Sequence, residues 1–144
     1  MLWYPSDTLT VAAAMSYNDT EITGDVAKTI PIVDIGNSLP LAPARQWNVR
    51  VRKDLSMNES YFQVVFKSSS KTYNSFEAAK VKDQPAYEIL DLAYGMTLND
   101  VDVEFFIRNA TDERANLYYN DQDDIPRITT NRPRNMGVRL SYRF

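Results

Sequence analysis

The sequence predicts an all-β fold, an antiparallel transmembrane β-barrel segment of about seven strands, and three observations support this fold class. Apolar side chains recur at every second residue along most of the chain. The stretches that alternate in this way are joined by connections that are short and long in turn. Many of the residues between the apolar ones are charged, so each strand has one apolar and one polar face.

The alternation locates the strands. A short first strand ends at Trp3 and Tyr4, just before the turn residues PSD. Six further stretches alternate with a period of two, namely residues 9–17, 47–51, 62–66, 90–98, 101–107 and 136–144. Within residues 101–107, Phe106 is the one apolar side chain on the otherwise polar phase. The chain is therefore predicted to contain seven strands.

The connections indicate how these strands are ordered. PSD, SMNES and ND are tight and rich in turn residues, whereas residues 22–45, 71–85 and 110–133 form long, polar, Pro-containing loops. Short and long connections alternate in this way in transmembrane β-barrels, where the short turns are periplasmic. A soluble sandwich or lipocalin-like barrel also alternates, but it turns its apolar face inward. Periodicity alone does not distinguish the two arrangements.

Three features favour the membrane arrangement. The strands run to about nine to eleven residues, enough to cross a bilayer when tilted. Aromatic residues lie near the turn ends, as an interfacial girdle requires, and these are Trp3, Tyr4, Tyr61, Phe62, Tyr142 and Phe144. The second face carries charges that suit a wet lumen, at Arg50, Arg52, Asp54, Asp91, Asp102, Glu104, Arg108, Arg139 and Arg143. We therefore expect Val49, Phe105, Val138 and Leu140 to face lipid.

Composition excludes several functional classes. The 144 residues include no histidine and no cysteine, so Ser-His or Cys-His catalysis and His or Cys metal sites cannot form. The basic residues are scattered and the net charge is -3, which argues against nucleic-acid binding. Asp121, Asp123 and Asp124 lack the pattern of a calcium loop and are interpreted as a solvated acidic loop. We therefore expect no enzymatic activity, no bound metal and no cofactor.

The last strand carries a recognisable pattern. Apolar or aromatic residues occupy alternate places up to the final residue, at Met136, Val138, Leu140, Tyr142 and Phe144. This pattern resembles the C-terminal assembly signal of bacterial outer-membrane proteins. The resemblance implies that the barrel-assembly machinery is a partner.

Two longer segments resemble the final strands of TonB-dependent outer-membrane receptors. The penultimate strand of that family ends in an Asn-x-Thr-Asp-Glu-like segment. YGMTLNDVDVEFFIRNATDERAN is similar, with Asn109, Thr111, Asp112 and Glu113 at these positions. In NRPRNMGVRLSYRF, Pro133 and Arg134 lead into the closing strand. The segment NSLPLAPARQWNVRVRKDL is similar to a recurring family segment with prolines before a Trp-bearing strand, here Pro40, Pro43 and Trp47.

This resemblance implies a specific organisation. Residues 1–144 would be the C-terminal part of a receptor barrel that has about 22 strands in all, with the N-terminal plug domain absent from the sequence. Strand parity agrees, because seven strands with a periplasmic C-terminus would place the first residue outside, whereas a complete barrel has both ends inside. The chain is therefore expected to need the missing plug and barrel strands as partners, together with outer-membrane lipid.

The resemblance also implies a function and a location. The parent protein would sit in the outer membrane of a Gram-negative bacterium and import a scarce solute, such as a siderophore, vitamin or glycan, with energy from TonB acting through the plug. Loop residues Tyr118, Tyr119, Asp121 and Arg127 are candidates for solute contact. A passive porin or small structural barrel is the alternative, and a soluble ligand-binding barrel is the third.

Overall fold

The computed structural model describes residues 1–22, 38–57, 59–76, 81–120 and 125–142, and every regular element in these ranges is a β-strand. Seven strands form one antiparallel sheet, namely β1 (Leu2–Ser6), β2 (Leu9–Tyr17), β3 (Arg45–Asp54), β4 (Tyr61–Ser69), β7 (Tyr87–Leu98), β8 (Val101–Arg108) and β11 (Asn135–Tyr142). The predicted all-β class and the predicted seven strands are confirmed. Among the described residues, no helix is long and apolar enough to cross a membrane.

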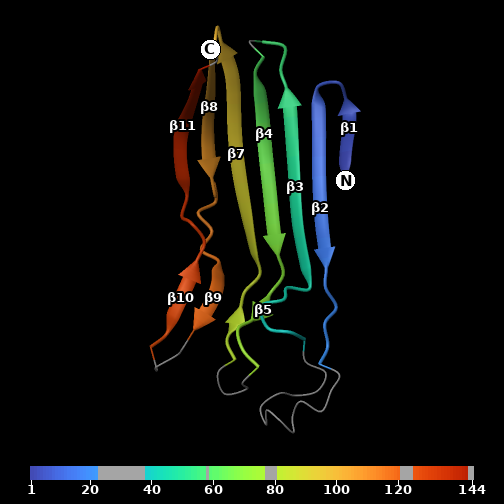
Figure 1. Cartoon of the computed structure of the whole chain (residues 1–144), viewed down its shortest axis with the longest axis vertical. Coiled ribbons are helices and arrows are strands. Elements are labelled where there is room, and N and C mark those ends of the chain that lie inside the picture. Colours follow the sequence, from blue (N-terminus) through green and yellow to red (C-terminus); the bar gives the residue numbers. More distant parts are fainter. Residues whose placement is uncertain (23–37, 58, 77–80, 121–124, 143–144) are drawn as a thin grey trace.

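The sheet is a meander in which each strand pairs with the previous and the next of the seven. The order is β1-β2-β3-β4-β7-β8-β11, so β1 and β11 are its two edges. The short connections lie together at one end of the sheet, at the top in Figure 1, and the long connections lie together at the other. We call these the short-turn end and the loop end. The predicted alternation of short and long connections is confirmed.

Two of the long connections contain strands that the sequence did not indicate. One holds the two-residue strands β5 (Thr72–Tyr73) and β6 (Asp83–Gln84), which pair with each other. Another holds β9 (Asn116–Asn120) and β10 (Arg127–Thr130), which form a hairpin below β8 and β11 in Figure 1. The expectation of plain loops was wrong here, because these strands are too short and too polar for a period of two to be recognised.

The tightest turn is explained by one residue. Only Asn99 and Asp100 separate β7 from β8, and Asn99 has a φ of 55°. Asparagine tolerates this left-handed conformation better than most residues, so it suits a two-residue hairpin turn. The turn fixes the register in which Leu98 pairs with Val101.

The register places the apolar phases of all seven strands on one face. Residues that pair directly across neighbouring strands share a face of the sheet. One such row crosses the whole sheet and consists of Trp3, Val11, Val51, Val64, Leu92, Ile107 and Met136. We call this the apolar face and its opposite the polar face.

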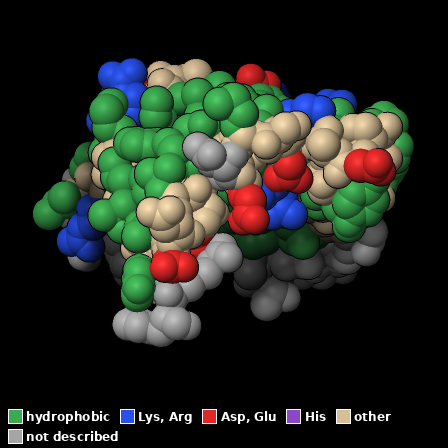
Figure 2. Space-filling view, turned by 90° about the horizontal axis from the view of Figure 1, so that it is seen from above, with side chains coloured by type: hydrophobic (Ala, Val, Ile, Leu, Met, Phe, Trp, Pro, Cys, Tyr) green, Lys and Arg blue, Asp and Glu red, His purple; other side chains and the backbone are tan. Residues whose placement is uncertain are grey.

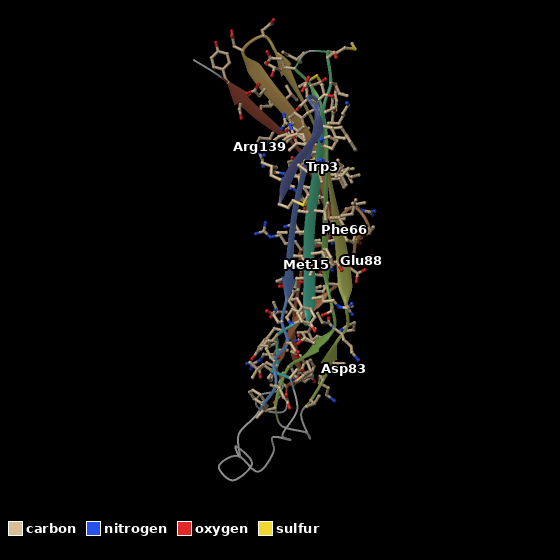
Figure 3. All side chains as sticks on the ribbon, turned by 90° about the vertical axis from the view of Figure 1, so that its right-hand side faces the viewer. Trp3, Met15, Phe66, Asp83, Glu88 and Arg139 are labelled. Atoms are coloured by element: carbon tan, nitrogen blue, oxygen red, sulfur yellow. The ribbon has the colours of Figure 1, made fainter. Side chains whose placement is uncertain are left out.

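Two further views show how these faces lie. Seen along the strands, the molecule forms an arch, and hydrophobic side chains cover much of its upper side in Figure 2. Seen edge-on, Phe66 and Glu88 project from one side of the sheet and Arg139 from the other (Figure 3). The register agrees, because Phe66 belongs to the apolar phase of β4 and Arg139 pairs with Glu104 on the polar phase.

Candidate functional site

The apolar face is exposed rather than packed into a core. Among the described residues, the only buried hydrophobic side chains are Ala93 and Ala115. Large side chains of the apolar face stay open, and Met136 and Leu140 are 67% and 68% exposed. An exposed apolar surface that continues across seven strands is too large for an ordinary water-facing surface and matches the lipid-facing band of a barrel.

The lipid-facing positions expected from the sequence all lie on this face. Val49 pairs with Phe66, and Phe105 pairs with Val138. Leu140 pairs with Val103 on the same phase. Their shared face agrees with the expectation, and contact with lipid itself stays a prediction.

The polar face has a compact side-chain network at its short-turn end. The hydroxyl of Tyr61 donates a hydrogen bond to Glu104 Oε2 at 2.6 Å, and Arg139 Nη1 lies 2.7 Å from Glu104 Oε1. The Arg52 guanidinium stacks over the Tyr61 ring, 3.6 Å from its centroid. Arg52 Nε also donates to Asp54 Oδ1 at 2.8 Å. These residues line a hollow of about 470 Å³.

Tyr61 corrects one expectation from the sequence. It was grouped with the aromatic residues of an interfacial girdle, but it pairs with Gly95 and lies on the polar face. A Cβ atom at Gly95 would overlap the Tyr61 ring, so the ring rests directly on the glycine backbone. Its position next to the turn suggested the membrane interface, whereas its phase in β4 decides its face.

Phe106, the apolar residue on the polar phase, is explained in a similar way. It pairs with Gly137 of β11, and a Cβ atom at that glycine would lie 2.8 Å from Phe106 Cζ. Arg108 and Arg139 lie 5.5 and 5.9 Å from the ring centroid, within reach of a cation–π interaction. The glycine thus provides the space for an aromatic ring among charged residues.

The loop end of the polar face is organised around Asp91. Its side chain is 7% exposed and accepts hydrogen bonds from Lys67 Nζ at 2.9 Å and from the Asn109 backbone N–H at 2.8 Å. Arg108 Nη1 lies 3.8 Å from the same carboxylate. One buried acid therefore joins β4, β7 and the end of β8, which satisfies the charge.

Asn109 connects the sheet to the β9–β10 hairpin. The residue is 4% exposed and has a φ of 51°. Its Nδ2 donates to the carbonyl oxygens of Glu113 and Arg132 at 2.9 and 3.0 Å, and its Oδ1 accepts from the Glu113 N–H at 2.9 Å. Both N–H donors of this amide and its oxygen are used on backbone groups of the two segments that lead into and out of the hairpin.

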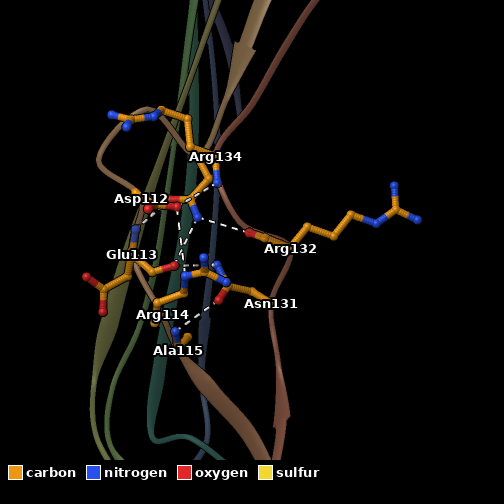
Figure 4. A network of polar contacts seen from close by, with 8 residues as sticks. Asp112, Glu113, Arg114, Ala115, Asn131, Arg132 and Arg134 are labelled. Atoms are coloured by element: carbon orange, nitrogen blue, oxygen red, sulfur yellow. Dashed lines mark hydrogen bonds and ion pairs between the residues drawn. The ribbon is translucent and has the colours of Figure 1, made fainter.

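Asn131 and Asp112 complete the junction, as Figure 4 shows. Asn131 accepts from the Ala115 N–H and donates to the Glu113 carbonyl, both at 2.9 Å. Asp112 Oδ1 accepts from the Arg134 N–H at 2.8 Å. This hydrogen bond from the Arg134 backbone, helped by the positive charges of Arg114 and Arg134, holds the pKa of Asp112 below its ordinary value.

The residues that resembled the receptor family therefore have a structural role here. Asn109, Asp112 and Glu113 all belong to this junction, and Arg134 reaches it through its backbone. Arg134 lies far from the other three in the sequence because the two halves of the junction flank the β9–β10 hairpin, which brings them together.

The candidate solute-contacting residues divide between the two sides of the hairpin. Tyr118 pairs with Thr129 and shares a side with Arg127, whose partner is Asn120. Tyr119 lies on the opposite side and pairs with Ile128. Its backbone carbonyl accepts a hydrogen bond from Asn74 Nδ2 at 3.4 Å, which ties the hairpin to the β5–β6 segment. Asp121 lies outside the described residues.

The residues of the expected assembly signal lie on the edge strand. Met136, Val138, Leu140 and Tyr142 all occupy the apolar phase of β11 and are exposed. Within the described part of the sheet, β11 pairs only with β8. Phe144 lies outside the described residues.

Sequence reasoning missed the partners that organise the polar face. Asp91 and Arg108 were noted as charged residues, but the junction formed by Asn109 and Asn131 was not foreseen. The glycines at 95 and 137 gave the only sequence signal for close ring contacts. Within the described residues, no cluster of three or more acidic, histidine or cysteine side chains could hold a metal ion.

The sequence matches no family model and no curated protein, so the comparison rests on solved structures. The chain is similar to the siderophore receptor PiuA from Acinetobacter baumannii, with a TM-score of 0.76 and 20% identity over 96% of this chain. It is also similar to the ferric yersiniabactin uptake receptor FyuA from Yersinia pestis, with a TM-score of 0.74 and 16% identity over 96% of the chain. The ferric-catecholate import receptor Fiu from E. coli matches 94% of the chain with a TM-score of 0.71 and 13% identity.

These matches concern the fold. The chain spans about one fifth of the length of each receptor, covering 20%, 21% and 19% of them. The resemblance to TonB-dependent receptors seen in the sequence is confirmed at this level, because almost the whole chain superposes on structures of such receptors. Its seven strands form an antiparallel sheet like part of their barrel.

Proposed function

We propose that the chain forms the C-terminal part of the barrel wall of a TonB-dependent outer-membrane transporter that imports a scarce solute. The observation that carries this proposal is the apolar row that crosses all seven strands, from Trp3 to Met136, with a charged face behind it. The row is exposed at both ends and half-buried between them. Such a sheet suits a wall between lipid and a wet lumen. The likeness to three import receptors supports the same assignment.

On this proposal residues 1–144 are the C-terminal part of the barrel domain. The plug domain and the remaining strands would belong to a longer protein, which agrees with the one-fifth coverage of the matched receptors. The edges at β1 and β11 would pair with strands of that protein, because an unpaired edge within hydrocarbon leaves backbone groups without hydrogen bonds. The protein would reside in the outer membrane of a Gram-negative bacterium.

Each part of the chain has a role in this proposal. The strands supply wall, and the loop end faces the outside, where Tyr118 and Arg127 on one side of the β9–β10 hairpin would contact solute. The alternating residues of β11, with Phe144 after them, would be read by the barrel-assembly machinery. TonB would act through the plug, so transport would depend on TonB although this chain does not itself touch it.

The solute class is a siderophore, vitamin or glycan. A siderophore is favoured by the matched receptors, since PiuA is a siderophore receptor and Fiu imports ferric catecholates. The same neighbours are import receptors rather than enzymes, which supports transport without catalysis.

The decisive experiment is uptake by cells that carry the full-length gene. Iron-starved cells lacking other receptors would be given radiolabelled ferric chelates, vitamin or oligosaccharide, with TonB present or deleted. We expect uptake of one of these solutes only when both the receptor and TonB are present. Uptake that persists without TonB would instead assign the protein to passive porins.

A further inference from the structure

The charges on the polar face are unevenly distributed along the strands. At the short-turn end, the acids Asp54, Asp102 and Glu104 exceed the arginines Arg52 and Arg139 by one. Both arginines are paired there, with Asp54 at 2.8 Å and Glu104 at 2.7 Å. This end of the polar face is therefore slightly acidic and its cations are neutralised.

The other half of the polar face has the opposite balance. In the half of the polar face nearer the loop end, the strands carry three cations, Arg50, Lys67 and Arg108, but only one acid, Asp91. Asp91 serves two of these cations, with Lys67 at 2.9 Å and Arg108 at 3.8 Å. Two positive charges are in excess here, although the chain as a whole has a net charge of -3.

Arg50 accounts for much of this excess. It pairs across the sheet with Ala12 and Val65, neither of which can accept a side-chain hydrogen bond. Within the described residues its guanidinium has no ion pair and no side-chain hydrogen bond. Ala12 and Ala14 lie on the polar phase of the neighbouring strand β2, and their side chains are single methyl groups. They therefore leave open space beside Arg50.

A hollow lies at this position. It has a volume of about 410 Å³, and its lining includes Met1 as well as the polar side chains of Arg50, Arg108, Asn48 and Gln63. Two guanidinium groups offer planar forks of N–H donors that match a carboxylate, and the two amides offer further donors. No acidic side chain lines the hollow itself, but the Asp91 carboxylate lies 3.8 Å from Arg108. Arg50 is therefore the guanidinium that an anion would meet without a competing negative charge.

We propose that this hollow binds a carboxylate-bearing small solute, with Arg50 as its principal contact and Arg108 as its second. This rests on the proposed transport function in one respect, because it takes the bound solute to be cargo that passes along the polar face. The competing occupant is an acidic side chain from another part of the longer protein.

The first test measures the electrostatic potential in the hollow of the full-length receptor. The chain has no cysteine, so Asn48→Cys places a single thiol of this chain at the hollow, and Ser141→Cys places one at the short-turn end of the same face. Receptors cleared of other reactive thiols are treated with anionic sulfonatoethyl or cationic trimethylammonioethyl methanethiosulfonate. At Asn48→Cys we expect the anionic reagent to react about fivefold faster, and the cationic reagent about fivefold slower, than each does with free cysteine, the effect of one unit charge about 4 Å away in water.

Two comparisons make this result specific. Adding Arg50→Gln should abolish the anionic preference at Asn48→Cys, while Ser141→Cys should prefer the cationic reagent in both backgrounds. A preference for the cationic reagent at Asn48→Cys would overturn the proposal. Protection of Asn48→Cys from both reagents would also overturn it, because the hollow would then be filled by another segment of the protein.

The second test uses citrate as a carboxylate probe and glucose as a neutral control. Citrate should slow modification of Asn48→Cys by a neutral thiol reagent, and Arg50→Gln should remove this protection, whereas glucose should have no effect. Equal effects of citrate with and without Arg50 would contradict the proposal. The proposed function and this inference can be refuted independently. Carboxylate binding without TonB-dependent uptake would refute the transport function alone. TonB-dependent uptake without carboxylate binding would refute this inference alone.

Discussion

The two faces of the sheet are built from the same strands by different rules. On the apolar face, side chains such as Val64 and Leu92 meet neighbours of similar chemistry in every direction. On the polar face, charged and aromatic side chains have particular partners, as Tyr61 has Glu104, and Arg50 is an exception. The contacts of the apolar face therefore require only that a residue be apolar. Those of the polar face require one particular residue at each position.

This difference teaches where single substitutions should act. Exchanging one apolar residue for another on the apolar face would preserve the proposed contact with lipid, so only a change of class should cost much free energy. Small changes on the polar face or at its loop end remove a specific contact or close a specific space. The predictions that follow use matched positions on the two faces.

The largest effect is expected when a charge is placed on the apolar face. Leu140→Arg in the full-length receptor should lower the free energy of unfolding in lipid by about 2 to 4 kcal/mol if the position is near the bilayer midplane. The reason is that the charged Arg side chain would be transferred from water into the hydrocarbon of the bilayer. Ser141→Arg, the next residue on the polar face, should cost less than about 1 kcal/mol, because the lumen is wet. Urea unfolding in lipid vesicles measures both. Equal costs would show that the two faces have been assigned wrongly.

The second effect concerns the loop end. Asn109→Ala should raise the amide exchange of Glu113 and lower the local free energy of opening by about 2 kcal/mol, because buried backbone carbonyls lose their donors and an N–H loses its acceptor. The left-handed φ of 51° adds to the cost, since alanine rarely adopts it. Hydrogen exchange read by mass spectrometry gives the result.

The control for this change is another asparagine of the polar face. Asn48→Ala should alter exchange and stability by less than about 0.5 kcal/mol, because Asn48 is exposed and carries no comparable set of hydrogen bonds. If both alanine variants behaved alike, the junction at Asn109 would not hold the hairpin.

The sequence predicted the fold and the apolar face well for a physical reason. A period of two assigns every residue of a strand to a face before any partner is known, and the connections order the strands. Thus Val138 and Leu140 were placed on the face where they occur. Partners on the polar face follow from register and rotamers, which the sequence does not state, and so the Asp91 and Asn109 contacts were not foreseen.

A smaller effect is expected where a ring rests on a glycine. Gly137→Ala should cost about 1 to 2 kcal/mol in the same unfolding assay, because the new methyl group would press on the Phe106 ring. Combining it with Phe106→Ala should cost less than the two single changes added together, since the methyl group then has room. Ser141→Ala on the same strand and face is the control. Strict additivity would show that the ring and the glycine are not in contact.

The smallest effect is a dependence on pH at the junction of sheet and hairpin. The N–H of Arg134 stabilises the ionised form of Asp112, so the folded pKa lies below the ordinary value of about 4. The carboxylate therefore contributes stability above that ordinary value, and the contribution is lost as the pH falls through the lowered folded pKa. Acidification should increase exchange of the Arg134 amide, corrected for its intrinsic rate, while amides paired within the sheet, such as that of Val138, stay protected. Asp112→Asn keeps an acceptor oxygen but cannot ionise, so it should remove this acid dependence. Since Asp112 is exposed to solvent, screening keeps the effect small, and a dependence that survives in Asp112→Asn would assign it to another group.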